Sequence, residues 1–264
     1  MNKLIALVLS ACLLVGCTST SATNECPVQG NKAAKHIRTN TCIETDKPKM
    51  ASIPGLNFLW NMKSSKWSQD ELTVCFLNGT NKQKEKVRKH AVEWEKYCGI
   101  KFIWLDTVDP NANIRVSFRC GGHWSYIGRY NKNVAAGKAT MNIELGSFEY
   151  DDEWRRVVLH EFGHALGLEH EHRHPNRGFE FKEEEVYRLY QQTQGWSREQ
   201  IYEQVISKAN PKPGEWEGTE WDDTSIMCYE IPSYLTKDGS WAGWNTKLSE
   251  KDKEHIGKMY PKSE

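Results

Sequence analysis

The chain has 264 residues, of which 38% are hydrophobic and 27% are charged, and it contains 11 tryptophans. This composition excludes a wholly disordered protein, because it supplies enough apolar surface for the core of one large domain or two small ones. The 35 basic and 35 acidic residues balance, so the net charge gives no reason to expect nucleic acid as a partner.

The first residues are typical of an export signal. A basic residue, Lys3, precedes a mostly apolar run over residues 4–15. This run is too short to cross a bilayer, which needs about 20 residues, but it suits a signal peptide. The sequence LVGC at residues 14–17 then resembles the lipobox of bacterial lipoproteins, in which the cysteine carries the lipid. We therefore expect a signal peptide over residues 1–16 and a lipid anchor on Cys17; the alternative is an ordinary signal that is cleaved elsewhere.

A polar stretch follows this cysteine. It contains few apolar residues and three prolines up to about residue 55. We interpret residues 17–55 as the anchoring cysteine, a tether and an irregular extension that is structural wrapping, a stalk or a propeptide. Thr18 stands where lipoproteins kept in the inner membrane often have aspartate. The expected location is therefore a bacterial cell envelope, at the outer membrane.

The pattern of a folded domain occupies residues 56–264 and starts with strands and one helix. A capping box formed by Thr80 and Gln83 predicts a helix that continues to about residue 98. Alternating or continuous apolar runs predict four strands. They cover residues 72–76, 102–105, 114–118 and 140–145.

Helices dominate the second half of the domain. Asp151 and its neighbour can cap a helix that Gly167 ends, since glycine takes the left-handed conformation that commonly stops helices. A second helical pattern over residues 182–206 is interrupted once near its middle. A last helix begins at Ser249, which forms a cap with the acidic residue three positions later.

The decisive motif lies at the end of the first of these helices. Its sequence, HEFGHALGLEH, occupies residues 160–170. His160 and His164 project from the same helical face, one turn apart, so both imidazoles can bind one metal ion. Gly167 lets the chain reverse and bring His170 back as a third ligand. Three imidazoles with one open position are typical of a catalytic zinc site, so we expect one Zn²⁺ at these residues.

Glu161 follows the first ligand and indicates the chemistry. Its carboxylate can address a zinc-bound water, whose pKa is lowered to roughly 7. It can accept a proton as the water attacks a peptide carbonyl and return that proton to the leaving amine. Because zinc binding needs neutral imidazoles, we expect activity to be lost below about pH 6. His172 and His174 are interpreted as surface or hydrogen-bonding groups, since three ligands suffice.

These motifs resemble the metzincin zinc peptidases, whose zinc motif is HExxHxxGxxH. Their second mark, a methionine turn (Met-turn) beneath the zinc, corresponds to Met227 in the sequence SIMCY. Within this clan the chain is similar to the astacins, because Glu171 follows the third histidine and Tyr229 lies two residues after the methionine. The sequence CGGHWSYIG at residues 120–128 also looks like the astacin run CWSYxG with three residues inserted. The resemblance covers residues 66–261.

The resemblance implies the fold class, which is α+β. A twisted mixed sheet and the zinc helix would form an upper subdomain to about residue 170, above a smaller, mostly helical or irregular lower subdomain over residues 171–264. A polypeptide substrate would lie extended along the edge strand of the sheet by backbone pairing. We expect residues 138–145 to be that edge.

The resemblance also implies roles for single residues. Glu161 would be the general base, and Tyr229 would approach the zinc and swing to stabilise the transition state. Met227 would be structural, as the floor beneath the zinc. Glu171 would contact the newly freed N-terminus of a matured enzyme.

The cysteine pattern departs from that of the astacins, which usually have histidine where Cys228 stands. Six cysteines after residue 17 of an exported chain suggest disulfides, and the sequence alone leaves 15 connectivities open. Cys98 and Cys120 fall where astacin cysteines fall, and the resemblance suggests that they pair with each other. Cys26 with Cys42 and Cys75 with Cys228 would complete the set. Alternatively, Cys26 or Cys42 supplies a thiolate that occupies the zinc and keeps the enzyme latent, as matrixin propeptides do.

The leading hypothesis is a zinc endopeptidase that acts on extracellular or envelope polypeptides, with a latent zymogen as one variant. An inactive zinc-binding surface module or adhesin is the second hypothesis, and Glu161 argues against it because such a module needs no base. The third is an exopeptidase or another zinc hydrolase. Four tryptophans are expected to pack the lower subdomain, with cleft lining as the alternative. They are Trp216, Trp221, Trp241 and Trp244.

Overall fold

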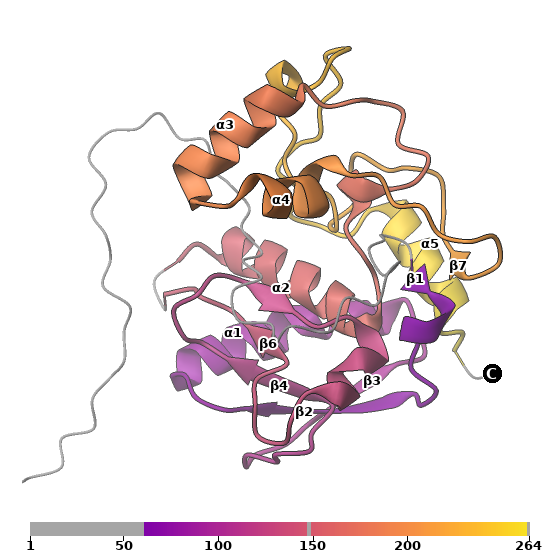
Figure 1. The fold of residues 1–264 in the computed structure, drawn as a ribbon. Coiled ribbons are helices and arrows are strands. Elements are labelled where there is room, and N and C mark those ends of the chain that lie inside the picture. The colour runs from indigo at the N-terminus through magenta and orange to yellow at the C-terminus, as the bar shows by residue number, and fades with distance from the viewer. Residues whose placement is uncertain (1–60, 147–148, 263–264) are drawn as a thin grey trace, which may run out of the picture.

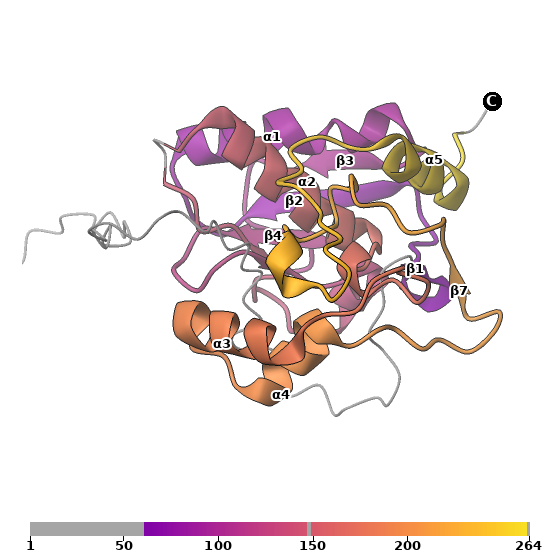
Figure 2. The same ribbon diagram turned by 90° about the horizontal axis from the view of Figure 1, so that it is seen from above.

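The computed structural model describes residues 61–146 and 149–262. Its first half contains a five-stranded sheet with two helices on one side (Figures 1 and 2). The strands lie in the order β3-β2-β4-β6-β5, and all neighbours are parallel except β5, which is antiparallel to β6. They are β2 (Glu71–Phe76), β3 (Lys101–Trp104), β4 (Ile114–Ser117), β5 (Trp124–Ser125) and β6 (Met141–Asn142).

Within the described chain, five α-helices and a π-helical turn accompany the strands. Figure 1 shows α3 and α4 on the far side of α2 from the sheet. The bounds are α1 (Asn81–Ala91), α2 (Asp151–Leu166), α3 (Glu183–Gln194), α4 (Arg198–Ile201), the π-helical turn η5 (Tyr202–Ile206) and α5 (Glu250–Met259). Short 3-10 turns complete the described chain: η1 (Lys63–Ser65), η2 (Trp94–Lys96), η3 (Gly128–Asn133), η4 (Glu171–Arg173) and η6 (Ser233–Leu235).

A second, two-stranded sheet joins distant parts of the chain. It pairs β1 (Asn61–Met62) antiparallel with β7 (Trp216–Glu217). The start of the described chain is thereby fixed beside the segment that precedes the Met-turn.

Two hydrophobic cores stabilise these elements by burying apolar surface. The sheet core lies between the sheet and helices α1 and α2, and it includes Met227. The second core lies around α3 and η5 and includes Cys228. The C-terminal helix α5 contributes Ile256 and Met259 to the sheet core, although its sequence position belongs to the expected lower subdomain.

Most expected elements are confirmed, with differences at their ends. The first expected helix is shorter, because α1 ends at Ala91 and the chain continues as the 3-10 turn η2. The expected cap of α2 is wrong: the N-cap is Tyr150, whose side chain makes no capping hydrogen bond. Asp151 is instead the first helical residue and binds α1.

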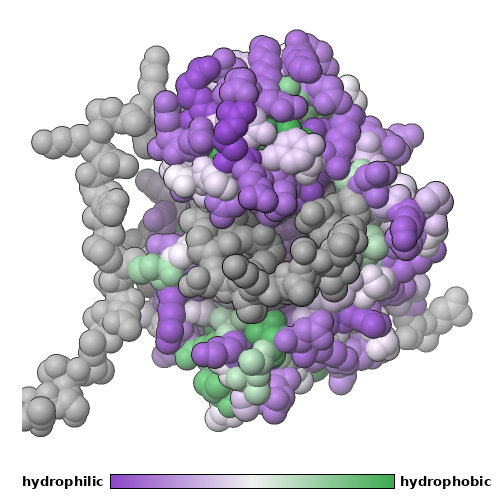
Figure 3. Space-filling model, in the orientation of Figure 1, coloured by the Kyte–Doolittle hydropathy of each residue, from purple (hydrophilic) through white to green (hydrophobic). Residues whose placement is uncertain are grey.

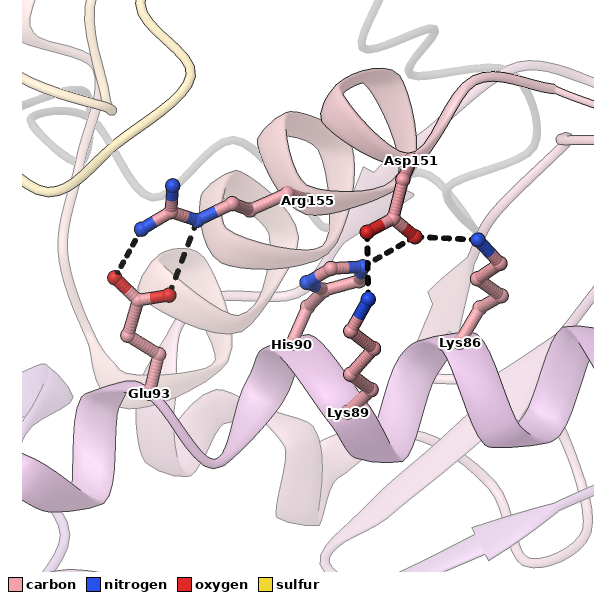
Figure 4. A network of polar contacts seen from close by, with 6 residues as sticks. All are labelled: Lys86, Lys89, His90, Glu93, Asp151 and Arg155. Atoms are coloured by element: carbon pink, nitrogen blue, oxygen red, sulfur yellow. Dashed lines mark hydrogen bonds and ion pairs between the residues drawn. The ribbon is translucent and has the colours of Figure 1, made fainter.

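Charged contacts between α1 and α2 explain that difference (Figure 4). Asp151 accepts hydrogen bonds from Lys86, from Lys89 at 2.6 Å and from His90 at 3.2 Å. Farther along α2, a bidentate pair joins Arg155 to Glu93. Acidic charge at the start of a helix also suits its dipole, so Asp151 contributes both to the helix and to its docking.

The position of the edge strand corrects a second expectation. Residues 138–145 contain β6, which lies inside the sheet between β4 and β5. One edge is β3 and the other is β5, a short antiparallel strand that the chain forms outside β6 before it passes through η3. A two-residue strand gives too little alternation to be recognised in the sequence.

Among the described residues, no helix is both long and apolar enough to cross a bilayer. Figure 3 shows that the visible face is mostly hydrophilic over α3 and α4, whereas hydrophobic residues gather at the sheet end of the molecule.

Candidate active site

Three histidines converge at the end of α2. His160 and His164 lie one turn apart on the helix, and both are buried. Gly167 ends the helix with φ of 108°, a left-handed conformation that glycine adopts at low cost. The chain then reverses and brings in His170. One ligand nitrogen from each of the three residues lies within 4.8 Å of the others, as predicted for His160, His164 and His170.

Hydrogen bonds on the far side of two rings fix their orientation. Nδ1 of His160 donates to the carbonyl of Ile226 at 2.8 Å, and Nδ1 of His164 donates to that of Leu168 at 2.8 Å. A carbonyl can only accept, so each ring presents the lone pair of Nε2. The Nε2 atoms of His164 and His170 are 3.1 Å apart. The hydrogen bonds from Nδ1 to the two backbone carbonyls are outer-sphere contacts of the kind that orient metal-bound histidines in proteins.

The chemistry of these donors fits a zinc ion. Nε2 of His160 is buried and has no hydrogen-bond partner among the described residues, which is costly unless something binds there. Burial lowers the pKa of His160 and His170 well below the ordinary value, with a further contribution from His164. The two rings are therefore neutral near pH 7, the form that zinc requires.

Two further side chains border the three histidines. Glu161 is buried, with 1% of its surface exposed, and it follows the first histidine on α2. The ring of Tyr229, also buried, lies 4.5 Å from that of His170 and 6.1 Å from that of His160, measured between centroids. The structure thus brings the predicted base and tyrosine to the predicted ligands.

Met227 packs directly beneath α2. A methyl group on Gly163 would overlap its sulfur, so the contact depends on the absence of a side chain there. The turn is held by Asp252 of α5, whose carboxylate accepts from Ser225 Oγ at 2.6 Å and from Ile226 N at 2.8 Å. The sequence identified Asp252 only as part of a helix cap, and no local pattern could have shown its contact with residues 26 and 27 positions earlier.

Glu171 borders a small cavity. Its carboxylate accepts from the backbone N of Asp222 at 2.8 Å, and it borders a cavity of ≈ 20 Å³ together with Asp252, Lys251 and His255. Burial raises the pKa of Glu171 well above its ordinary value. The cavity has room for about one water molecule.

The loop before the edge strand is built on the three inserted residues. Gly121 N and Gly122 N donate to one carboxylate oxygen of Glu144, at 2.9 and 2.6 Å. The backbone N of Glu144 in turn donates to His123 Nδ1 at 3.1 Å. These contacts fix the entry into β5 (Trp124–Ser125), which pairs only with β6 among the described strands.

The described cysteines overturn two of the suggested disulfides. Cys75, Cys98 and Cys228 are free thiols, so neither Cys98 with Cys120 nor Cys75 with Cys228 is a pair. Cys98 is buried in the sheet core, where its sulfur donates to Trp94 O at 3.4 Å. Cys228 is buried in the second core, away from Cys75 on β2. The positions of the cysteines in the sequence do not show in which core each of them is buried.

Several predictions concern residues outside those described: the lipid site Cys17, the signal peptide over residues 1–16, and both hypotheses for Cys26 and Cys42.

The remaining histidines and tryptophans mostly have structural contacts. His172 and His174 are buried and donate to the carbonyls of Gln204 and Thr219; neither belongs to the ligand cluster. Of the four tryptophans, Trp221 packs as expected, against the second core. Trp216 lies instead against the sheet core, and Trp244 lies against Arg156 of α2 at 4.1 Å. Trp241 differs, because 64% of its surface is exposed.

The chain is similar to known proteins in sequence and in structure. The family model described as Astacin, a family of peptidases, matches residues 59–263. A solved structure of myroilysin is 32% identical, with a TM-score of 0.73 over 77% of this chain and 99% of that one. Zinc metalloproteinase nas-30 of Caenorhabditis elegans is 26% identical over 197 residues, which are 70% of this chain and 24% of that protein. Bone morphogenetic protein 1 of Xenopus laevis is 28% identical over 152 residues, 58% of this chain and 18% of that protein.

Proposed function

The chain belongs to the astacin family of peptidases, and we propose that it hydrolyses polypeptides at internal peptide bonds with Glu161 as general base. Membership in this family confirms the α+β metzincin fold, the single catalytic zinc and the class of enzyme, a zinc metalloendopeptidase. The chain spans only 9–36% of the length of the first curated relatives that it matches, so the activity of the whole protein, its substrates and its partners are part of the proposal.

One observation carries the proposal: the ligand atoms of three imidazoles gather at one point beside a buried carboxylate. Zinc bound at His160, His164 and His170 would polarise the scissile carbonyl and make the attacking water more acidic. The protein's part is then to move protons and stabilise charge. We assign the first task to Glu161, whose carboxylate takes a proton from the attacking water and delivers it to the nitrogen of the leaving amine.

Tyr229 is proposed for the second task. Its ring lies against His170, and its hydroxyl is buried. A phenol there can donate a hydrogen bond to the oxygen that becomes negative as the tetrahedral intermediate forms. Such a donor, held in place beforehand, lowers the barrier more than one in water, because no solvent must reorganise.

The substrate is proposed to lie extended along β5. This strand is the free edge of the sheet next to α2 within the described chain. Backbone hydrogen bonds to an edge strand bind a polypeptide independently of its sequence. The substrate was expected along residues 138–145 because these were expected to form the edge strand. Residues 124–125 form that edge instead, so we propose that the substrate pairs with them.

The cellular setting is proposed from the sequence alone. The lipobox at residues 14–17 supports a lipid on Cys17, and Thr18 supports the outer membrane. The catalytic domain over residues 56–264 would then meet envelope or extracellular polypeptides. Glu171 is proposed to contact a freed N-terminus after removal of the extension, because it lines a cavity with other charged groups.

The test compares the zinc-loaded protein with Glu161→Gln on an unfolded protein substrate. We expect cleavage at internal bonds by the wild type, and a rate lower by about 10²–10⁴-fold in the variant, the range that general bases supply. Both proteins should hold one zinc per chain. Equal cleavage by both would refute the role of Glu161. If neither protein cleaves the substrate, even after removal of residues 17–55, the result would favour the inactive zinc-binding module over the endopeptidase.

A further inference from the structure

A histidine two residues after the third ligand has no part in the chemistry described so far. His172 is buried, with 0% of its surface exposed. It lies in η4 (Glu171–Arg173), the turn that leads away from the zinc ligands. Full burial of a polar ring costs free energy unless its nitrogens are bound, so its contacts indicate what it does.

One nitrogen of His172 is anchored to η5 (Tyr202–Ile206). Nε2 donates to the carbonyl of Gln204 at 2.9 Å. The same turn is held by two neighbours of His172: Arg177 donates to the carbonyl of Ile206, and Arg173 donates to Ser207 Oγ at 2.9 Å. A π-helical turn is rare and often occurs at functional sites. Here three side chains from one short segment bind its C-terminal end.

The face of the imidazole supports Tyr229. The two rings are stacked, with centroids 4.2 Å apart and an interplanar angle of 29°. The ring of His170 lies 5.0 Å from His172 and 4.5 Å from Tyr229. The phenol ring therefore packs against both a zinc ligand and a ring that lies outside the ligand cluster, and these two rings also contact each other.

The other nitrogen of His172 makes no hydrogen bond within the described chain that could orient the ring. Because Nε2 carries the hydrogen, Nδ1 is an acceptor, and no described residue donates to it. His172 and Tyr229 border a cavity of ≈ 10 Å³ that is otherwise lined mostly by apolar and aromatic residues of the second core. This is about the space of one water molecule. Among the described residues, the carbonyl of Gln204 is thus the polar group that fixes the plane of this imidazole.

We propose that His172 is a positioning residue for Tyr229. The carbonyl of Gln204 sets the plane of the imidazole, and the imidazole face sets the plane of the phenol ring beside the zinc site. This inference rests on the proposed function, in which the Tyr229 hydroxyl stabilises the transition state. A donor must be held closely to be effective there, since small displacements lose much of the rate advantage.

The test uses the full zinc-loaded chain with His172→Phe, which keeps an aromatic face but loses the anchor. We expect kcat to fall by about 10-fold with KM unchanged, because a loosened donor loses part of the roughly 10²–10³-fold that an oxyanion donor supplies. In a Tyr229→Phe background the same substitution should cause no further loss, since the hydroxyl that it positions is absent. Affinity for a phosphinic peptide, which mimics the tetrahedral intermediate, should fall by the same factor as kcat.

His90→Phe is the matched control. His90 is also buried and also has one hydrogen-bonded nitrogen, but it lies on α1 and contacts Asp151. It should lower the melting temperature and leave kcat and phosphinic-peptide affinity unchanged. Equal losses from His172→Phe with and without the Tyr229 hydroxyl, or wild-type kcat in His172→Phe, would overturn the inference while cleavage by the wild type upholds the proposed function. Absence of cleavage by the wild type would overturn both.

Discussion

The zinc site is assembled from two kinds of structure. The helix α2 supplies His160, Glu161 and His164 through regular spacing, and it is buried along most of its length in the sheet core. The segment from Gly167 to Tyr229 supplies His170 and Tyr229 through turns, and it is held largely by hydrogen bonds from buried polar side chains. Spacing along one helix therefore fixes part of the site locally, whereas the rest of the site depends on contacts between distant residues.

Acidification should destabilise two elements outside this assembly, the loop before β5 and the helix α5, and is the largest expected effect. Burial lowers the pKa of His123, beside the edge strand, and of His255, in α5, from 6.5 to about 4. The unfolded chain binds a proton at each ring near pH 6.5 and the folded chain does not, so this stabilisation is complete above pH 6.5 and is lost toward pH 4. The free energy of unfolding of the zinc-free protein should fall by roughly 2 kcal/mol per ring between pH 7 and pH 5.

Urea unfolding at the two pH values measures this loss. His255→Gln keeps a donor for Asn61, and His123→Asn keeps an acceptor for Glu144 N. Each variant should lose its own share of the pH dependence. A pH dependence equal to that of the wild type in both would show that other groups cause it.

Gly163→Ala tests the contact between the two kinds of structure. Alanine normally stabilises a helix relative to glycine, but here its methyl group would overlap the Met227 sulfur. We expect the free energy of unfolding to fall by about 1–3 kcal/mol, as for other overpacked cores. Gly178→Ala is the control, because nothing lies within 4 Å of the added methyl group. A destabilisation no larger than that of the control would mean that the Met-turn moves away without cost.

Asp252→Asn should weaken the downstream segment without touching α2. The two carboxylate oxygens accept from Ser225 Oγ, Ile226 N and Ser249 N. An amide offers one acceptor oxygen, so a buried donor is left unpaired at a cost of about 1–2 kcal/mol. The melting temperature and the zinc affinity of the variant measure this loss. Asp238→Asn is the control, because Asp238 is exposed, and it should change neither quantity. Unchanged zinc affinity in Asp252→Asn would show that the zinc site does not depend on the contact of Asp252 with the Met-turn.

Lys89→Ala should have the smallest effect. Lys89 pairs with Asp151 at the start of α2, but 60% of its side chain is exposed, as is 45% of that of Asp151 (Figure 4). Surface pairs of this kind contribute less than about 0.5 kcal/mol, because water and salt screen them. Unfolding at low and high salt measures it. A loss above about 1 kcal/mol would mean that the docking of α1 on α2 depends on this charge pair.

The parts of the site that depend on local spacing could be predicted from the sequence, and the parts that depend on distant contacts could not. The ligands on α2 and the stop at Gly167 could be predicted because helical periodicity and glycine conformation act within a few residues. The edge strand could not, because which strand lies outermost depends on how β5 and β6 pair. The contacts of Asp252 and His172 were missed for a related reason. Asp252 accepts from residues 26 and 27 positions earlier in the chain, and His172 contacts residues 32 and 57 positions later.

The clamp on the Met-turn also has a consequence for timing. During synthesis, all three zinc ligands and Tyr229 leave the ribosome before α5 does, because α5 follows them in the chain. Until Asp252 arrives, the turn that carries the Ile226 carbonyl, which orients His160, lacks the carboxylate that accepts from Ser225 and Ile226. We expect a nascent chain that ends before residue 250 to bind zinc weakly and to cleave nothing. Under the proposed function, a cell that makes this protein would thereby be spared digestion by its own half-made copies.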